Sequence, residues 1–441
     1  MRRFRLEMIT SFCLMVLLLL SACMEMPMIR DDRNEGRGGE DDVNDDEGNT
    51  SITEGELDIS NATGEGIDSV ISSINRFGLD VFLTLEQENE GANIFISPYS
   101  LYTALSMTYE GARGRTAEEM FEVMHLVENE SLRRSSFASI QNGISGEGDH
   151  NLSTANSIWP QYNKPFKEDF INIIKRFYLG EVNKVDFYNE YEKARILINE
   201  WVENETNGKI KDLIPRGVID PATVMVLTNA IYFRSEWART FDENLTKDLD
   251  FHPEDGRIVS VPMMISRGEE SIYNYTEKDG VQVLELPYSG VDLSMLVLLP
   301  KDGDLDSLIN GLSWEMIQGM REDLEEMEVE VTFPKFRLSN KYFMRETLID
   351  MGMKTAFDPS ADFTGMLPEP IWIDQVIHQG FIEVDEEGTE AAAATAVVMK
   401  NYSMEPESEI FRADHPFLFI IQERDTGNIL FLGKVSDPTS K

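Results

Sequence analysis

The spacing of hydrophobic residues changes from a helical period to a strand period near residue 220. Before that point, apolar residues return at steps of three and four, which predicts a first helix over 67–85 and further helices after it. Beyond it, residues 327–333 alternate between apolar and polar, which predicts a strand. Near the end, runs at 417–421 and 429–432 flank a turn sequence and predict a hairpin. Helices first and strands later predict an α+β fold.

The N-terminus has the character of an export signal. Three arginines lie at the start, and an apolar run over 8–22 follows, which is shorter than the roughly 20 apolar residues of a membrane-spanning helix. The run ends in Leu20-Ser21-Ala22-Cys23, which resembles the lipobox of prokaryotic lipoproteins. That resemblance implies a signal peptide over 1–22, a lipid on Cys23, and an exported protein that is membrane-anchored or extracellular. The alternative is an ordinary secretory signal with an incidental cysteine.

The segment after the signal is strongly acidic. Residues 24–66 contain 14 acidic and 3 basic residues and few apolar ones, so we expect 23–66 to be a disordered linker that carries the lipidated cysteine. No Pro/Gly-rich break follows residue 66, which predicts one folded domain over 67–441. The formal net charge of the chain is −41, which argues against nucleic acid, heparin and anionic lipid as main partners, because each would be repelled.

Sequence motifs of catalysis are absent. The chain contains neither the phosphate-binding GxxxxGK[ST] nor the nucleophile motif GxSxG. Its 5 histidines are far apart in sequence, and its 2 cysteines are too few for a cysteine-rich metal site. We therefore predict no enzymatic activity, no cofactor and no metal. A hydrolase whose site is assembled from distant residues is the alternative.

The most unusual segment is 386–403. It follows a predicted strand over 381–384 and contains a run of alanines, then β-branched residues, with no proline. Alanine favours helices, so a short helix is one interpretation. At the period of a strand, Glu390 would lie on a face that could meet water, and the opposite face would be small and uncharged. That second face comprises Thr389, Ala391, Ala393, Thr395 and Val397. Such a segment can be a loop in one state and a central strand in another.

This segment resembles the reactive-loop hinge of the serpins, the serine protease inhibitor family. Further motifs occur in the family's order: NIFISPYS (93–100), TNGKIKDLI (206–214), LTNAIYFRSEW (227–237), VPMM (261–264), FPKF (333–336), IHQGFIEVDEEGTEAA (377–392), DHPFLFII (414–421) and FLGKVSDP (431–438). The resemblance covers essentially all of 67–441. It implies the serpin fold, a single large domain with a dominant β-sheet, two smaller sheets, about eight or nine helices and an exposed reactive loop.

The resemblance also implies a mechanism. A target serine protease attacks the loop and forms an acyl-enzyme, after which the cleaved loop inserts into the main sheet and deacylation stalls. The chain would then be a monomeric suicide substrate with a serine protease as its covalent partner. Small hinge residues favour an inhibitory member, and the alternative is a non-inhibitory serpin that acts as a binding or structural protein. The hinge comprises Glu386, Gly388, Thr389, Glu390, Ala391, Ala392, Ala393, Ala394 and Thr395.

The attacked bond is implied by loop length. In inhibitory serpins it usually follows the seventeenth residue counted from the hinge glutamate, which gives Tyr402–Ser403 when Glu386 is the first. An aromatic residue before the bond suits the hydrophobic pocket of chymotrypsin- or subtilisin-like proteases. Lys400–Asn401 is the runner-up and would suit trypsin-like proteases, and bonds at Met399 or Met404 are further options.

Other residues take their expected roles from the same resemblance. Trp237 and His378 match residues at the top of the large sheet, where insertion begins, and a hydrogen-bonded cluster there would hold the sheet closed. Asn229, Ser97 and Ser100 belong to the same expected group. The alternative for each is a simple core residue. Residues 113–130 lack the basic cluster of heparin-activated members, so heparin activation is not expected.

Overall fold

The computed structural model describes residues 57–144, 151–268, 271–389 and 408–440. The predicted signal peptide, Cys23 and most of the predicted linker lie outside these ranges. So do residues 390–407, which include both candidate reactive bonds, Tyr402–Ser403 and Lys400–Asn401.

Nine α-helices form in the described residues. They are α2 (Gly64–Glu88), α3 (Pro98–Tyr109), α4 (Gly114–Val123), α5 (Glu130–Ile144), α6 (Glu168–Tyr178), α7 (Phe187–Glu205), α8 (Leu305–Gly311), α9 (Trp314–Glu322) and α10 (Arg345–Asp350). Two short 3₁₀ turns, η1 (Glu243–Leu245) and η2 (Thr355–Phe357), accompany them. No helix in the described part of the chain is both long and apolar enough to cross a membrane.

The folded body begins ahead of the predicted boundary at residue 67. The Thr63 hydroxyl accepts a hydrogen bond from the Gly66 amide at 3.0 Å and caps the start of α2. Further upstream, the Asp58 amide donates to the Arg176 carbonyl at 2.9 Å, and the buried Asp58 carboxylate is ion-paired with the Arg176 guanidinium. The acidic composition of the linker did not reveal this anchor, because a single paired aspartate is enough to fix the chain.

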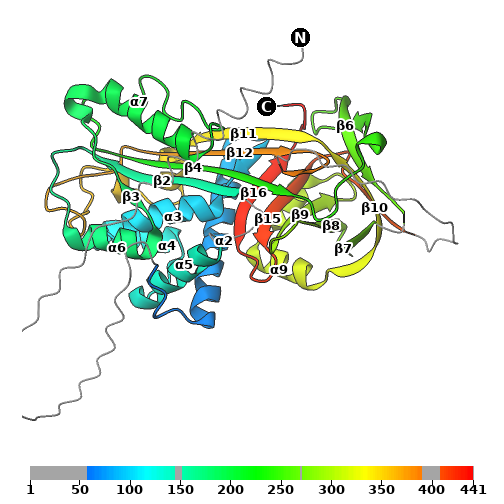
Figure 1. The fold of residues 1–441 in the computed structure, drawn as a ribbon, viewed down its shortest axis with the longest axis horizontal. Helices are drawn as coiled ribbons and strands as arrows, with labels where there is room; N and C mark the ends of the chain where they lie inside the picture. The colour runs from blue at the N-terminus through cyan, green and yellow to red at the C-terminus, as the bar shows by residue number, and fades with distance from the viewer. Residues whose placement is uncertain (1–56, 145–150, 269–270, 390–407, 441) are drawn as a thin grey trace, which may run out of the picture. The chain divides into compact units, whose positions relative to one another are not determined.

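A six-stranded sheet runs through the molecule (Figure 1). Its strands, in spatial order, are β11 (Phe336–Phe343), β12 (Gln375–Val384), β13 (Gly388–Thr389), β4 (Met225–Glu236), β2 (Asn151–Pro160) and β3 (Glu181–Val182). The long strands β12 and β4 also pair directly with each other, in parallel, from Gln375–Val226 to Phe381–Tyr232. Two strands that are distant in sequence therefore share a seam in the middle of the sheet.

The other strands form a ten-stranded sheet. Its order is β1 (Ile94–Ile96), β16 (Ile429–Val435), β15 (Phe417–Glu423), β9 (Leu293–Pro300), β8 (Val281–Pro287), β7 (Ile272–Lys278), β10 (Glu325–Pro334), β6 (Val259–Ser266) and β5 (Lys247–Phe251), with β14 (Glu409–Arg412) beside β10. The first half of β10 pairs with β7 and its second half with β6. The two expected smaller sheets are therefore joined through β10, and the predicted α+β class is confirmed.

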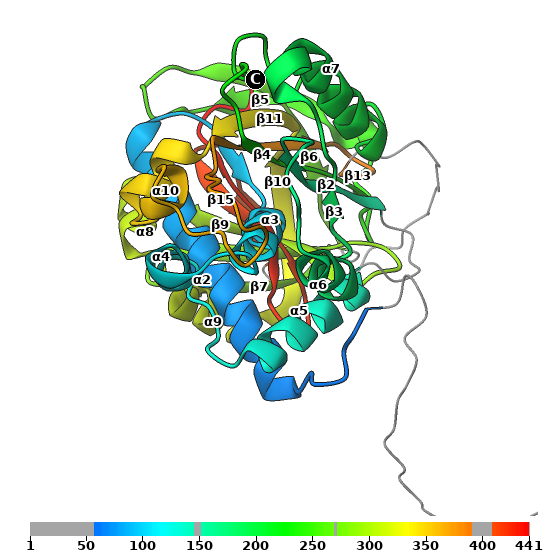
Figure 2. The ribbon, with the colours of Figure 1, turned by 90° about the vertical axis from the view of Figure 1, so that its left-hand side faces the viewer.

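Both faces of the six-stranded sheet are covered. Figures 1 and 2 show α7 on one side of it and α3 on the other. The alternation of β4 explains how: Ile231 and Phe233 face the main core, whereas Ala230 and Tyr232 face a second apolar cluster under α7. Such two-sided burial gives a strand that is almost continuously apolar, as the sequence of β4 is.

Candidate functional site

The hinge begins inside the six-stranded sheet. After β12 the chain turns at 385–387, and β13 then pairs antiparallel with both neighbours: Thr389 with Val384 of β12, and Gly388 and Thr389 with Glu236 and Ser235 of β4. The Asp385 carboxylate accepts the amides of residues 387 and 388 at 3.0 and 3.3 Å, which fixes the turn. The start of the hinge is thus a third strand wedged where β4 and β12 part.

The neighbouring backbone leaves no room for a side chain at Gly388. A Cβ atom at this position would lie 2.2 Å from the Ser235 carbonyl oxygen and 2.7 Å from the Cα of Glu236. Both are backbone atoms of β4, so the obstruction cannot be relieved by rotating a side chain. The close approach of two backbones is therefore what demands glycine here.

Trp237, the residue that follows β4, contacts this hinge start. Its indole N–H donates to the Asp385 carbonyl at 3.0 Å, and its backbone amide donates to the Glu387 carbonyl at 2.8 Å. The indole stacks on Tyr288, with ring centres 4.7 Å apart and planes 12° apart. The Tyr288 hydroxyl in turn lies 2.7 Å from the hydroxyl of the buried Thr389. Trp237 therefore lies directly beside the start of the hinge.

Glu386 provides a second attachment. Its carboxylate is ion-paired with Lys335 and accepts the Thr246 hydroxyl at 2.8 Å, and its carbonyl accepts the Phe241 amide at 2.8 Å. Burial raises the pKa of Glu386, but the Lys335 ammonium and the Thr246 hydroxyl outweigh burial and lower the pKa below its usual 4.5. At neutral pH the charged pair therefore holds the turn before β13 against neighbouring strands and loops.

His378 belongs to a separate buried cluster in the middle of the seam. Its Nε2 accepts the Ser97 amide at 3.0 Å, so Nδ1 carries the proton and donates to Oδ1 of the Asn229 side chain. The Asn229 amide group also donates to the Ser100 hydroxyl at 2.5 Å and to the side chain of Asn156. Burial lowers the pKa of His378 to about 3, so the ring is neutral at physiological pH.

This cluster joins five elements around the seam. His378 and Asn229 are register partners on β12 and β4, Ser97 and Ser100 lie at the start of α3, and Asn156 lies on β2. The Ser97 hydroxyl also donates to the Leu430 carbonyl of β16 at 2.6 Å. These bonds hold β4 and β12 together and fix α3 beneath them.

The prediction that Trp237 and His378 lie together at the top of the sheet is wrong in one respect. Trp237 is there, but His378 lies beside Asn229, about eight residues or about 26 Å further down β4. The structure therefore forms two groups, one at the hinge start and one within the seam. A sequence motif does not show how far along the sheet a residue lies, because that position depends on which residue of the neighbouring strand it pairs with.

Several residues of these groups were not predicted. Tyr288, Thr246 and Asn156 stand in no motif that marks them, since each meets its partner through tertiary contacts. Lys335 could have been found, because it lies within the FPKF motif and carries the charge that the hinge glutamate needs.

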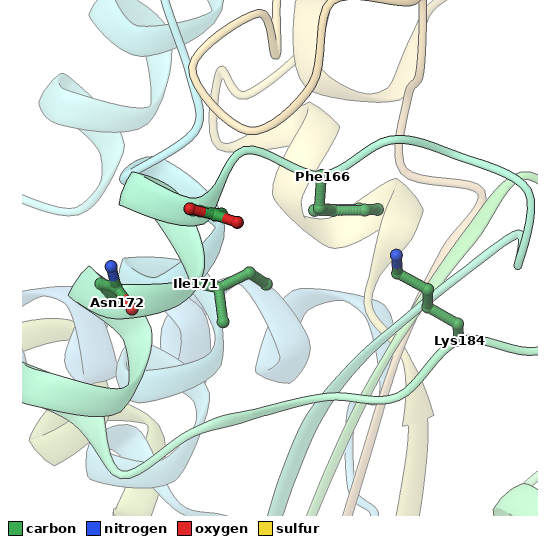
Figure 3. A pocket seen from close by; sticks show the side chains of 5 residues that line it. Phe166, Ile171, Asn172 and Lys184 are labelled. Atoms are coloured by element: carbon green, nitrogen blue, oxygen red, sulfur yellow. The ribbon is translucent and has the colours of Figure 1, made fainter. Parts of the chain in front are cut away.

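A surface pocket lies at the other end of the sheet from the hinge. It has a volume of about 330 Å³ and lies at the start of α6, lined by Phe166, Glu168, Ile171, Asn172 and Lys184 (Figure 3). The Lys184 ammonium lies 5.7 Å from the centre of the Phe166 ring. In the described residues no group of three or more His, Cys, Asp or Glu side chains is arranged to hold a metal ion. The hinge start and the seam remain the candidate functional site.

Comparison with known proteins relates the chain to a family. The family described as Serpin (serine protease inhibitor) matches residues 72–438. An uncharacterized serpin-like protein of Thermococcus kodakarensis is 43% identical over 374 residues, which cover 84% of this chain and 86% of that protein. The human leukocyte elastase inhibitor is 38% identical over 379 residues, which cover 83% of this chain and 99% of that protein.

Solved structures agree with the fold. Human thyroxine-binding globulin has a TM-score of 0.77 at 29% identity, covering 85% of this chain and all of that chain. Serpin48 of the insect Tenebrio molitor has a TM-score of 0.75 at 30% identity, covering 84% of this chain and 98% of that chain.

Proposed function

Because the chain belongs to the serpin family, we propose that it is an inhibitory member that traps a serine protease through cleavage of its reactive loop and insertion of the hinge into the six-stranded sheet. The observation that carries this proposal is the position of β13, which already pairs with both β4 and β12 where they part. Insertion then requires only that β13 lengthen between β4 and β12.

The registers of the three strands agree on where each hinge residue would go. Thr389 pairs with Ser235 and with Val384, and continuing both antiparallel ladders places Ala392 between Tyr232 and Phe381. These two residues are already partners on one rung of the β4–β12 pairing. The lengthening strand therefore meets the closed seam in register, without a slip or a bulge.

Continuing further places Thr395 between Asn229 and His378. Insertion thus breaks the bond that joins this pair across the seam. Odd-numbered hinge residues would face the main core, as Thr389 does, and even-numbered ones the cluster under α7. Beyond Glu390, the face of the hinge that carries Glu390 would therefore meet protein rather than water, which explains why Ala392, Ala394 and Ala396 are as small as the residues of the opposite face.

The free energy gained by insertion is large. About a dozen inserted residues add on the order of ten ladder hydrogen bonds, or on the order of 10 kcal/mol at about 1 kcal/mol each. That is comparable with the whole stability of a typical domain, about 5–15 kcal/mol. In the proposed mechanism, this strand insertion is the source of the free energy that distorts the acylated protease.

The proposed target is a chymotrypsin- or subtilisin-like protease attacking Tyr402–Ser403. The aromatic Tyr402 before the bond supports this choice, and the leukocyte elastase inhibitors among the relatives support inhibition of a serine protease. We also propose that the protein acts as an exported monomer attached to a membrane by a lipid on Cys23. Labelling of the wild-type protein, but not of a Cys23→Ser variant, with a radioactive fatty acid in the native host would test that attachment.

Mixing the protein with chymotrypsin and separating the products on a denaturing gel tests the proposal. We expect a covalent band at the summed mass, and mass spectrometry of the released C-terminal peptide should show that it begins at Ser403. A Thr389→Arg variant places a charge against Tyr288 in the core and should be cleaved without forming the band.

Clean cleavage of the wild-type loop without the band would overturn the proposal and favour a non-inhibitory serpin that binds a partner or has a structural role. Turnover of a peptide or ester substrate by the protein alone would instead favour a hydrolase. A released peptide that begins at Asn401 would replace Tyr402–Ser403 by the runner-up bond.

A further inference from the structure

An aromatic pair closes the seam at the point where insertion must begin. Tyr232 of β4 and Phe381 of β12 form the last rung of the parallel pairing, and Tyr232 lies three residues along β4 from Ser235, the partner of Thr389 at the end of β13. Their rings lie on the α7 face with centres 6.3 Å apart, and both side chains are buried. The growing hinge strand must therefore separate these rings before any other pair of β4 and β12 residues.

A lysine outside the sheet bridges this pair. Lys209 belongs to the connection between α7 and β4, and its ammonium lies 5.8 Å from the centre of the Tyr232 ring and 5.8 Å from the centre of the Phe381 ring. A cation is attracted to the negative face of each ring. One charge therefore interacts with both strands at once, and opening the seam leaves it near one ring at most.

A second cation near the pair has a different position. Arg337 of β11 lies with its guanidinium 4.8 Å from the centre of the Phe381 ring. Because β11 pairs with β12 along its whole length, Arg337 is on the same side of the seam as Phe381. Its contact can therefore persist when β4 and β12 separate, whereas the bridge through Lys209 cannot.

We propose that Lys209 is a positioning residue that holds Tyr232 and Phe381 together and so slows entry of the hinge into the sheet. The inference rests on the proposed function, because it concerns the rate of the same insertion. A barrier at this rung keeps the intact protein from inserting its own uncleaved loop and sets the time that an acylated protease has for deacylation.

The test measures uptake of a labelled synthetic peptide of residues 390–399 by the intact protein, followed by fluorescence anisotropy. A Lys209→Gln variant should take up the peptide about two- to five-fold faster, which corresponds to loss of one cation–π contact from the barrier. Lys209→Arg should restore the wild-type rate, since arginine keeps the cation.

Two matched variants distinguish this role from a merely structural one. Lys211→Gln removes the same charge from the same connection, but Lys211 is paired with Glu203 at 2.8 Å, so the uptake rate should not change. Arg337→Gln should lower the denaturation midpoint of the intact protein and leave the uptake rate unchanged, because its contact survives opening of the seam.

The outcomes separate this inference from the proposed function. If the wild-type protein takes up the peptide and Lys209→Gln does so no faster than Lys211→Gln, the bridge does not control insertion. Equal acceleration by Arg337→Gln would also overturn it, since any cation near the ring would then suffice. Failure of the wild-type protein to take up the peptide, together with no gain in melting temperature after loop cleavage, would refute the proposed function itself.

Discussion

Lowering the pH should loosen the seam through His378. In the intact protein this ring is fully buried, accepts a hydrogen bond from the Ser97 amide and donates one to Asn229. A second proton would have to enter at Nε2, where it would face the Ser97 N–H instead of an acceptor. Burial accordingly lowers the pKa of His378 to about 3 from its ordinary 6.5.

The direction and size of the change in stability with pH follow from the difference between the pKa of His378 in the folded protein and its ordinary pKa. Between the two pKa values the unfolded chain binds a proton that the folded protein does not, so stability falls as the pH drops below 6.5. At pH 5 the unfolded state gains about 2 kcal/mol relative to its value at neutral pH, because one pKa unit corresponds to about 1.4 kcal/mol. For a domain of this size, that loss lowers the melting temperature by about 2–3 °C.

The assay compares thermal unfolding of the intact wild-type protein and a His378→Gln variant at pH 7.5 and pH 5. Glutamine offers an amide oxygen that accepts and an amide NH2 group that donates, so it can replace both bonds of the imidazole without a titrating group. Carboxylates contribute the same pH dependence to both proteins, so the wild type should lose about 2 kcal/mol more than the variant. Parallel losses in the two proteins would refute the buried, neutral histidine and its role in the seam.

Three further substitutions test the hinge and the segment between β14 and β15. Gly388→Ala should shift the products of the chymotrypsin reaction from covalent complex to cleaved protein on a denaturing gel, because its Cβ meets the backbone of β4, whereas Gly143→Ala, with open space around it, should not. Trp237→Phe keeps the stacked ring but removes the indole donor, and should lower the free energy of unfolding by about 1 kcal/mol in urea titrations; an unchanged midpoint would show that the bond adds nothing. Burial lowers the pKa of His415, but its hydrogen bond to Asp414 and other contacts outweigh burial and raise the pKa above 6.5. The stabilising contribution of His415 is therefore present below pH 6.5 and is lost as the pH rises through the raised pKa. His415→Gln should therefore destabilise the protein more at pH 6 than at pH 9, and a loss equal at both would contradict this.

The sequence revealed the parts of the site that depend on local pattern. The strand that ends at Val384 could be predicted, because its apolar run lies within one segment, whereas the small residues predicted to form the hinge after Thr389 lie outside the described residues. The family resemblance added Trp237, which the structure places at the hinge start.

The remaining parts depend on contacts between distant segments. The depth of His378 in the seam follows from its pairing with Asn229, and the bridge of Lys209 follows from the path of the connection after α7. Neither is encoded in a local pattern. The fold begins before the predicted boundary at residue 67 for the same reason, because Asp58 is ion-paired with Arg176, more than a hundred residues later in the chain.

The melting temperatures of the intact protein and of the protein nicked once in its reactive loop, compared by calorimetry, test the central proposal most directly. If the hinge lengthens β13 between β4 and β12, the nicked form gains on the order of 10 kcal/mol and should melt more than about 10 °C higher. A nicked form that melts at or below the temperature of the intact one would show that no strand has been added, and the inhibitory mechanism would have to be abandoned.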